Sequence, residues 1–157
     1  MLPFATVLAQ DSAPDKPVAV VSIASYDQLI KDFSYLTGVS GRPEIGNIAE
    51  FVSEPFARHM NTERPAGILF TIADGDPKGV GFLPIPDLDK LLAMVTEKFG
   101  AEVEELDDGI KRVRWNQNVY LKQQGEWVFF TDAVSHLKRL PSDPASHLAG
   151  LDKKYDA

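Results

Sequence analysis

An acidic loop separates two apolar runs near the middle of the chain, and its residue types could bind calcium. Residues 74–79 read Asp-Gly-Asp-Pro-Lys-Gly, with acids at the first and third positions and glycine at the sixth, as in an EF-hand loop. The fifth position is Lys78 and the twelfth is Ile85, where an EF-hand needs an oxygen ligand and a bidentate glutamate. We therefore expect a tight turn, which aspartate and glycine favour, and no metal site.

Gly79 and Gly81 could instead belong to a phosphate-binding loop. Such a loop lies between a strand and a helix, so that free amide groups at the helix N-terminus face the phosphate. Here residues 82–85 continue as a strand, and Pro84 and Pro86 carry no amide hydrogen. The pattern excludes a phosphate loop. The glycines indicate a bulge or close packing, and the prolines place residues 82–85 at a sheet edge or a strand end.

Histidine and serine are the remaining side chains that could support metal binding or hydrolysis. His59, His136 and His147 are not spaced for chelation, and no His-Glu-x-x-His motif occurs. Ser40 stands one residue short of a Gly-x-Ser-x-Gly motif, and it follows a helix where that motif follows a strand. We expect no catalytic residue, no metal and no cofactor. A small hydrolase or other enzyme with a dispersed active site stays open as an alternative.

A basic and aromatic stretch, residues 111–115, is a candidate interaction surface. Strand alternation places Arg112 and Arg114 on one face, and Lys111, Val113 and Trp115 on the other. The carboxylates of residues 102–108 precede it, and a pair of them could cleave a glycosidic bond in a cleft with sugar-stacking aromatics. The default interpretation is a solvated strand edge and turn, with cross-strand ion pairs to the basic residues. We retain Arg112 and Arg114 as a speculative interaction patch.

The elements that would position these residues begin with a β-branched run, 18–24. Its continuous apolarity is typical of a strand buried on both faces. Ser25 follows as a helix N-cap, Gln28 completes a capping box, and Gly38 ends the helix in the left-handed conformation. The face of this helix that we expect to be buried comprises Tyr26, Leu29, Ile30, Phe33 and Leu36.

A second helix begins at Pro43 and ends or kinks at Pro55. Its apolar side chains are Ile45, Ile48, Phe51 and Val52. Two further apolar runs, 67–73 and 79–85, predict a β-hairpin.

Asp87 then caps a helix that Gly100 ends. The buried stripe of that helix is Leu88, Leu91, Leu92, Val95 and Phe99.

The last third of the chain predicts antiparallel strands joined by short polar turns, over residues 101–106, 110–115, 119–122 and 127–131. A final helix, capped by Asp132, is expected before Pro141. The fold class is therefore α+β: an antiparallel-rich sheet with helices mainly on one face. We expect a ferredoxin-like split β-α-β with an extra helix and a C-terminal β-meander.

Composition bounds the class of protein further. The chain has 157 residues, enough for one domain with its own core. Asp and Glu outnumber Lys and Arg by 23 to 16, which gives a net charge of −7 and argues against nonspecific binding to nucleic acid or to an anionic membrane. With no cysteine in the chain, disulfides, thiol catalysis and cysteine-ligated metals are excluded.

The ends of the chain indicate export. Val7-Leu8-Ala9 matches the small-x-small pattern of a signal peptidase site, with cleavage expected after Ala9, and the apolar stretch is shorter than the ~20 residues of a membrane span. We divide the chain into a signal-peptide remnant and linker (1–16), a single α+β domain (17–149), and a tail (150–157) that leads to a second module. The expected location is secreted or periplasmic.

Several stretches resemble a group of uncharacterised secreted proteins of planctomycete-type bacteria. The matching stretches are 15–26 (Asp-Lys-Pro-Val-Ala-Val-Val-Ser-Ile-Ala-Ser-Tyr), 81–84 (Gly-Phe-Leu-Pro), 119–122 (Val-Tyr-Leu-Lys) and 150–153 (Gly-Leu-Asp-Lys). Members of that group begin with an intact signal peptide and continue past the Gly-Leu-Asp-Lys stretch into a second module. This chain does neither, so the resemblance implies that it is a fragment of a longer protein. It implies no activity, cofactor or catalytic residue.

These observations favour an exported envelope or periplasmic module that is non-catalytic and acts through contacts with a protein partner in the cell envelope. We expect no nucleic-acid partner and no transmembrane segment. An inhibitor or ligand-binding domain that presents a sheet face is a further alternative beside the enzyme. The oligomeric state is not specified by the sequence.

Overall fold

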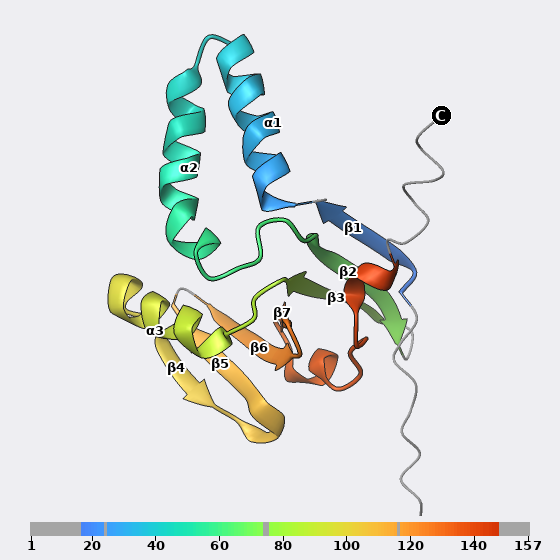
Figure 1. The fold of residues 1–157 in the computed structure, drawn as a ribbon. Coiled ribbons are helices and arrows are strands. Elements are labelled where there is room, and N and C mark those ends of the chain that lie inside the picture. Colours follow the sequence, from blue (N-terminus) through green and yellow to red (C-terminus); the bar gives the residue numbers. More distant parts are fainter. Residues whose placement is uncertain (1–16, 24, 74–75, 116, 148–157) are drawn as a thin grey trace, which may run out of the picture.

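The computed structural model describes residues 17–23, 25–73, 76–115 and 117–147, without the side chains of residues 48, 51, 52, 73, 76 and 147. These residues form an α+β fold around one seven-stranded sheet, as the sequence predicts (Figure 1). The strands are β1 (Ala19–Ile23), β2 (Ala66–Ala73), β3 (Asp76–Leu83), β4 (Glu102–Glu105), β5 (Ile110–Arg114), β6 (Asn118–Gln124) and β7 (Trp127–Thr131), and the α-helices are α1 (Tyr26–Val39), α2 (Pro43–Ala57) and α3 (Leu88–Phe99). The predicted signal-peptide remnant, the cleavage site after Ala9 and the tail 150–157 lie outside the described residues.

The strand order is β1-β2-β3-β7-β6-β5-β4, and every neighbouring pair is antiparallel. The ferredoxin-like split β-α-β is therefore not confirmed. The doubled helix explains the difference: α1 leads away from the sheet and α2 returns to it, so β2 starts beside the end of β1 and runs antiparallel to it (Figure 1). A single crossover helix would have favoured a parallel pair. The β-meander is present as β4 to β7.

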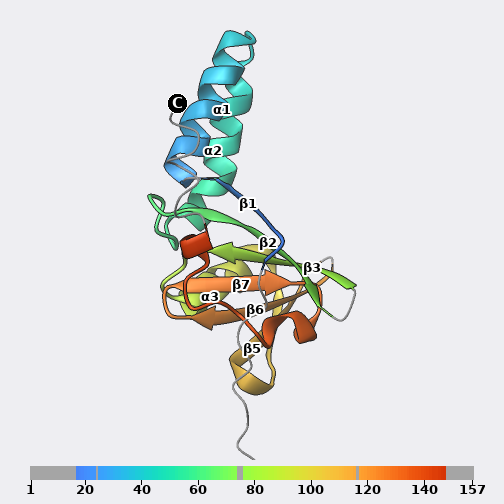
Figure 2. The ribbon, with the colours of Figure 1, turned by 90° about the vertical axis from the view of Figure 1, so that its right-hand side faces the viewer.

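The two faces of the sheet are covered by different elements. On one face, α3 packs over apolar side chains of β3, β5, β6 and β7, which are Leu83, Val113, Leu121 and Val128. On the other face, the segment after β7 covers a cluster made of Leu69, Val80, Phe82, Ile110, Trp127, Phe129 and Leu137. The expectation of helices mainly on one face holds for α3 alone, because α1 and α2 extend away from the sheet (Figure 2).

The helix α3 follows its prediction closely. Asp87 is the N-cap and accepts a hydrogen bond from the Lys90 amide at 3.1 Å, and Gly100 ends the helix with a φ of 67°. Leu88, Leu91 and Leu92 are buried as expected. A strong apolar period and two unambiguous caps leave this segment no competing structure.

The strand β1 is not buried on both faces, contrary to its prediction. It is the edge strand of the sheet, and four of its five residues are exposed. Val20 packs against the cluster under the C-terminal segment, whereas Val21 on the other face is 62% exposed. A continuous apolar run predicts that both faces of a strand are covered, but it carries no information on whether a covering element exists.

The helices α1 and α2 form an antiparallel hairpin whose start is as predicted. The hydroxyl of Ser25 accepts a hydrogen bond from the Gln28 amide at 3.1 Å, while the Gln28 side chain donates to Asp32, so half of the capping box forms. Gly38 does not end α1, because it lies within the helix and the left-handed glycine is Gly41, with a φ of 75°.

Pro43 starts α2 as predicted, but Pro55 does not end it. The helix continues to Ala57 with Pro55 inside it. A proline near the last turn removes one amide donor and is tolerated there better than in mid-helix.

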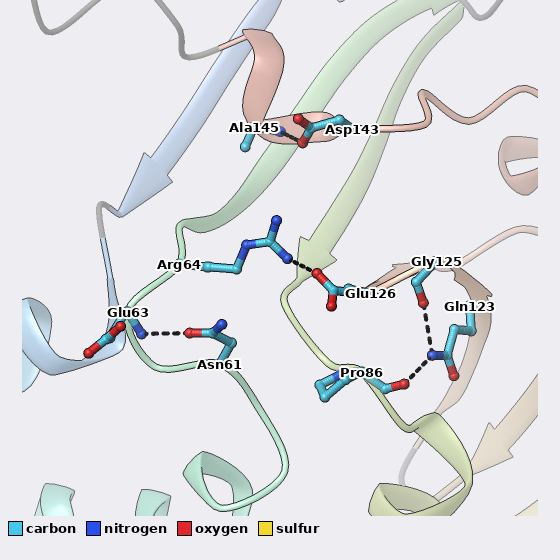
Figure 3. A network of polar contacts seen from close by, with 9 residues as sticks. All are labelled: Asn61, Glu63, Arg64, Pro86, Gln123, Gly125, Glu126, Asp143 and Ala145. Carbon is cyan, nitrogen blue, oxygen red and sulfur yellow. Dashed lines mark hydrogen bonds and ion pairs between the residues drawn. The ribbon is translucent and has the colours of Figure 1, made fainter.

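The base of the hairpin is attached to the sheet through the loop that follows α2. Arg64 forms an ion pair with Glu126, and its guanidinium lies 4.9 Å from the centroid of the Trp127 ring. Nearby, the Gln123 side chain donates to the carbonyl of Pro86 at 2.7 Å (Figure 3).

The expected final helix is reduced to a 3₁₀ turn, Val134–Leu137, because one apolar anchor, Leu137, is buried and the turn has no side-chain cap.

Candidate functional site

An apolar groove lies on the half of the sheet that α3 leaves open. It has a volume of about 430 Å³ and is lined by side chains of β2, β3, β6 and β7 together with the start of the C-terminal segment. Its apolar lining comprises Ile68, Phe70, Pro77, Val119 and Phe130, and its polar rim comprises Gln117, Asn118, Thr131, Asp132 and His136. Register places Ile68, Gly81, Phe130 and Leu121 in one row across the sheet, on the face that α3 covers further along.

Two glycines of β3 form the floor of the groove, and they act differently. A Cβ atom on Gly81 would lie 2.0 Å from Cζ of Phe130, so the Phe130 ring rests directly on the backbone of β3. A Cβ atom on Gly79 would meet Phe70 at 3.6 Å and Ile68 at 3.9 Å, which is ordinary contact. The predicted close packing is therefore confirmed at Gly81, while Gly79 keeps the groove deep beside Phe70.

The rim contains a hydroxyl, an imidazole and a carboxylate in mutual contact. The Thr131 hydroxyl oxygen lies 3.0 Å from Nδ1 of His136 and 3.2 Å from Oδ1 of Asp132, and that carboxylate oxygen lies 3.5 Å from the same Nδ1. A nucleophile–base–acid relay needs one imidazole nitrogen on the nucleophile and the other on the acid. Here both groups meet Nδ1, so the arrangement does not supply a hydrolase relay.

The buried Thr131 instead has a structural task. Its hydroxyl lies 3.1 Å from the carbonyl oxygen of Gly79, beyond the point where the paired residues of β3 and β7 end at Gly81 and Phe130. The side chain thus closes the end of the ladder where backbone pairing stops. His136 and Asp132 hold the hydroxyl from the solvent side of the groove.

A second hollow, of about 790 Å³, lies between the β4–β5 turn and the 3₁₀ turn after β7. It contains the predicted acids Glu105, Asp107 and Asp108 together with Lys122 and Lys138. Its described lining includes no aromatic side chain on which a sugar could stack. Its mixed charges do not single out a substrate.

Arg112 and Arg114 lie on β5 opposite acids of β4. Glu104 pairs with Arg112 and Glu102 with Arg114 in the strand register, and both pairs form ion pairs. The hydrogen bond and charge of Glu102 raise the pKa of Arg114 above its usual value. The predicted cross-strand ion pairs are confirmed, and a partner for this patch stays a prediction.

The aromatic residue of this stretch is turned away from the arginines. As alternation predicts, the other face of β5 points to α3: Lys111 pairs with Asp89 at 3.0 Å, and the rings of Trp115 and Phe99 lie 5.6 Å apart. Arg112 and Arg114 therefore lie on the opposite face of the sheet from Trp115, whereas Lys111 shares the face of Trp115.

The other sequence candidates have structural places. Gly79 and Gly81 lie inside β3, as expected from the rejection of a phosphate loop, and the Ser40 hydroxyl donates to the carbonyl of Thr37 at the end of α1. Pro84 follows the end of β3, which agrees with the predicted strand end, although β3 is internal to the sheet. In the described ranges, no three His, Asp or Glu side chains are arranged to hold a metal ion. Asp74 and Gly75 lie outside those ranges.

The groove is the feature that the sequence does not reveal. Its apolar residues come from four strands and alternate with core residues, so each is indistinguishable from a buried position. The sequence signal for the groove is the pair Gly79 and Gly81, because glycines at alternate positions of a strand leave one of its faces without side chains.

Comparison of the chain with protein-family models, with curated proteins and with solved structures finds no match. The resemblance to secreted planctomycete-type proteins therefore stays a prediction. Over the part of the chain that the structure describes, no helix combines the length and the apolar content needed to cross a bilayer.

Proposed function

We propose that this chain is an exported, non-catalytic module of the cell envelope or periplasm, whose sheet groove binds an extended apolar segment of a partner protein. The observation that carries this proposal is the groove itself. Its volume of about 430 Å³ lies within the ~300–1,000 Å³ of ligand-binding pockets.

The surroundings of the groove favour an extended segment over a compact ligand. Ile68 and Phe70 are each 38% exposed, and the apolar surface continues along the sheet to the exposed Ile72 and Val21. A strip of this kind accommodates alternate side chains of a strand-like peptide. An apolar sheet face of this extent is characteristic of an interaction site.

Charge specifies the partner further. The protein has a net charge of −7, and the side chain of Asp132 on the rim is 89% exposed. Complementary charge steers association and suppresses wrong partners. The segment should therefore place a basic residue beside its apolar side chains.

Gly79 gives a direct test. In Gly79→Val, the new side chain begins in ordinary contact with Phe70 and Ile68 and fills the groove. The probe is a capped hexapeptide in which lysines flank two valines and a phenylalanine, titrated by calorimetry or NMR. We expect Gly79→Val to weaken its binding at least about tenfold, the equivalent of ~1.4 kcal/mol.

The matched control is Lys78→Met, one residue away on the opposite face of β3. It should bind the peptide at least as tightly as wild type, because it removes a positive charge that repels the peptide. Equal binding by wild type and Gly79→Val would contradict the proposal. Binding of a neutral apolar dye in the groove without binding of the peptide would replace it by the small-ligand alternative.

The export part of the proposal is supported by the residues that resemble a cleavage site and by the likeness to secreted proteins. Expression of the gene with its upstream coding region should place the product outside the cytoplasm, with a new N-terminus at Gln10. Recovery of the product only from the cytosol would overturn this part and leave the groove test unaffected.

A further inference from the structure

The hydrogen bonds at the rim of the groove fix which nitrogen of His136 carries a proton. The Thr131 hydroxyl has a single hydrogen, and the Gly79 carbonyl and the Asp132 carboxylate, 3.1 Å and 3.2 Å from it, can only accept. Nδ1 of His136, 3.0 Å from the same hydroxyl, would be a third acceptor for that one hydrogen if it were unprotonated. Nδ1 therefore carries a hydrogen that it donates to Thr131, and the uncharged ring keeps its lone pair on Nε2.

The second ring nitrogen of His136 is an acceptor that solvent can reach. Over the described part of the chain, no interaction joins Nε2 to another group, and no fully buried side-chain nitrogen or oxygen lacks a partner. Nε2 is therefore not fully buried. His136 lines the groove, and its side chain is only 18% exposed, so the rim of the groove is where a ligand meets this nitrogen.

Asp132 supplies a second acceptor beside Nε2. One of its carboxylate oxygens lies 3.5 Å from Nδ1 of His136, and its side chain is 89% exposed. Nε2 belongs to the same five-membered ring as Nδ1, so one donor group at ~2.9 Å from each acceptor bridges the two side chains. The described lining of the groove contains no lysine and no arginine. The two acceptors thus form a site for a cationic donor.

We propose that Asp132 and His136 together bind the ammonium group of a lysine in the partner segment, so that lysine is the basic residue that the groove selects. This inference rests on the function proposed above and specifies its ligand. An ammonium group is a compact charge with three donors, of which one meets the carboxylate and another meets Nε2. The apolar stem of the lysine packs along the lining beside Pro77 and Val119.

Other ligand groups fit this pair of acceptors less well. The planar guanidinium of an arginine matches the two oxygens of a single carboxylate, whereas these acceptors are an oxygen and a ring nitrogen on different side chains. A neutral apolar group would cover both acceptors without giving them a donor, which costs binding free energy. An anionic group would be repelled by Asp132.

Peptide titrations with the full chain test the inference. The probes are the lysine hexapeptide described above and the same peptide with methionine in place of lysine, which keeps an apolar stem and removes the charge. Wild type should bind the lysine peptide at least about tenfold more tightly. His136→Asn keeps an amide donor for Thr131 and removes Nε2, so it should weaken the lysine peptide at least about fivefold and the methionine peptide less than about twofold. The matched control Ser135→Ala, at the exposed preceding position, should change neither affinity.

Two further measurements do not depend on how well His136→Asn folds. Asp132→Asn alters a largely exposed side chain and should also reduce the preference for the lysine peptide. Nitrogen–proton correlation spectra of wild type at about pH 8 should show the proton of the His136 ring on Nδ1. A proton on Nε2 would overturn the inference before any peptide is added.

The outcomes separate this inference from the groove proposal. Equal affinity of wild type for the two peptides, or equal weakening of both by His136→Asn, would overturn the selection of lysine and leave the groove proposal intact. An arginine peptide that binds as tightly as the lysine peptide would also overturn it, because the acceptors would then not select an ammonium group. Failure of wild type to bind either peptide would refute the groove proposal, and this inference with it.

Discussion

Replacing Gly81 by alanine should destabilise the protein through one neighbour, the ring of Phe130. The added Cβ atom would lie 2.0 Å from Cζ of that ring, whereas carbon atoms in good contact are ~3.5–4.0 Å apart. The ring must therefore move by more than an ångström, and overpacking of this kind costs about 1–3 kcal/mol. For a domain of this size, a loss of about 2 kcal/mol lowers Tm by roughly 4–8 °C.

A double-mutant cycle isolates the contact. In a Phe130→Ala background the ring is absent, and Gly81→Ala should cost less than about 0.5 kcal/mol, leaving a coupling of roughly 1.5 kcal/mol. Gly79→Ala is the matched control, because its Cβ atom meets Phe70 at an ordinary 3.6 Å; its effect should stay within about 1 kcal/mol of zero. Urea unfolding monitored by circular dichroism measures the stabilities of the four proteins of the cycle and of the control. An equal cost of Gly81→Ala with and without the ring would refute this reasoning.

Three further predictions concern charged groups. The hydrogen bonds from Lys90 hold the pKa of Asp87 below 3.8, so this cap stabilises the fold above pH 3.8 and its contribution is lost as the pH falls through the lowered pKa. Asp87→Asn should therefore flatten the acid limb of stability against pH, measured by urea unfolding. An unchanged acid limb would count against this role of Asp87. The Asp89 carboxylate raises the pKa of Lys111 above 10.5. This pair therefore stabilises the fold below pH 10.5, and its contribution is lost as the pH rises through the raised pKa. In Lys111→Met, the part of the stability loss at alkaline pH that comes from this pair should be absent. Replacing Arg112 and Arg114 with alanine should abolish retention on the envelope partner if the patch binds it, and unchanged retention in a pull-down from envelope extract would dismiss the patch.

The sequence predicts the elements better than their arrangement. β7 spans its predicted residues, and α3 begins and ends at its predicted caps. Apolar periodicity, turn residues and capping residues all depend on the local sequence. Strand order depends on which distant strands pair, and the reversal caused by the α1–α2 hairpin has no local signature. Gly38 illustrates the limit: several glycines near a helix end could each adopt the left-handed conformation, and Gly41 does so.

Burial was the least predictable property. The apolar faces of β1 and α1 read as core positions, yet Val21, Leu29 and Leu36 are exposed. The apolar periodicity of a segment identifies its apolar face. It does not show whether another element of the same chain packs on that face. The groove and the exposed apolar residues of the hairpin both arise from this difference.

The α1–α2 hairpin is inserted between β1 and β2, two neighbouring strands of the sheet. Ile23 and Ala66 are register partners in neighbouring antiparallel strands, and the Asp27 amide donates to the carbonyl of Thr62, so the chain enters and leaves the hairpin at adjacent points. The two helices thus occupy the place of a reverse turn between β1 and β2. We expect a shortened variant that joins β1 to β2 by a tight turn to keep the sheet.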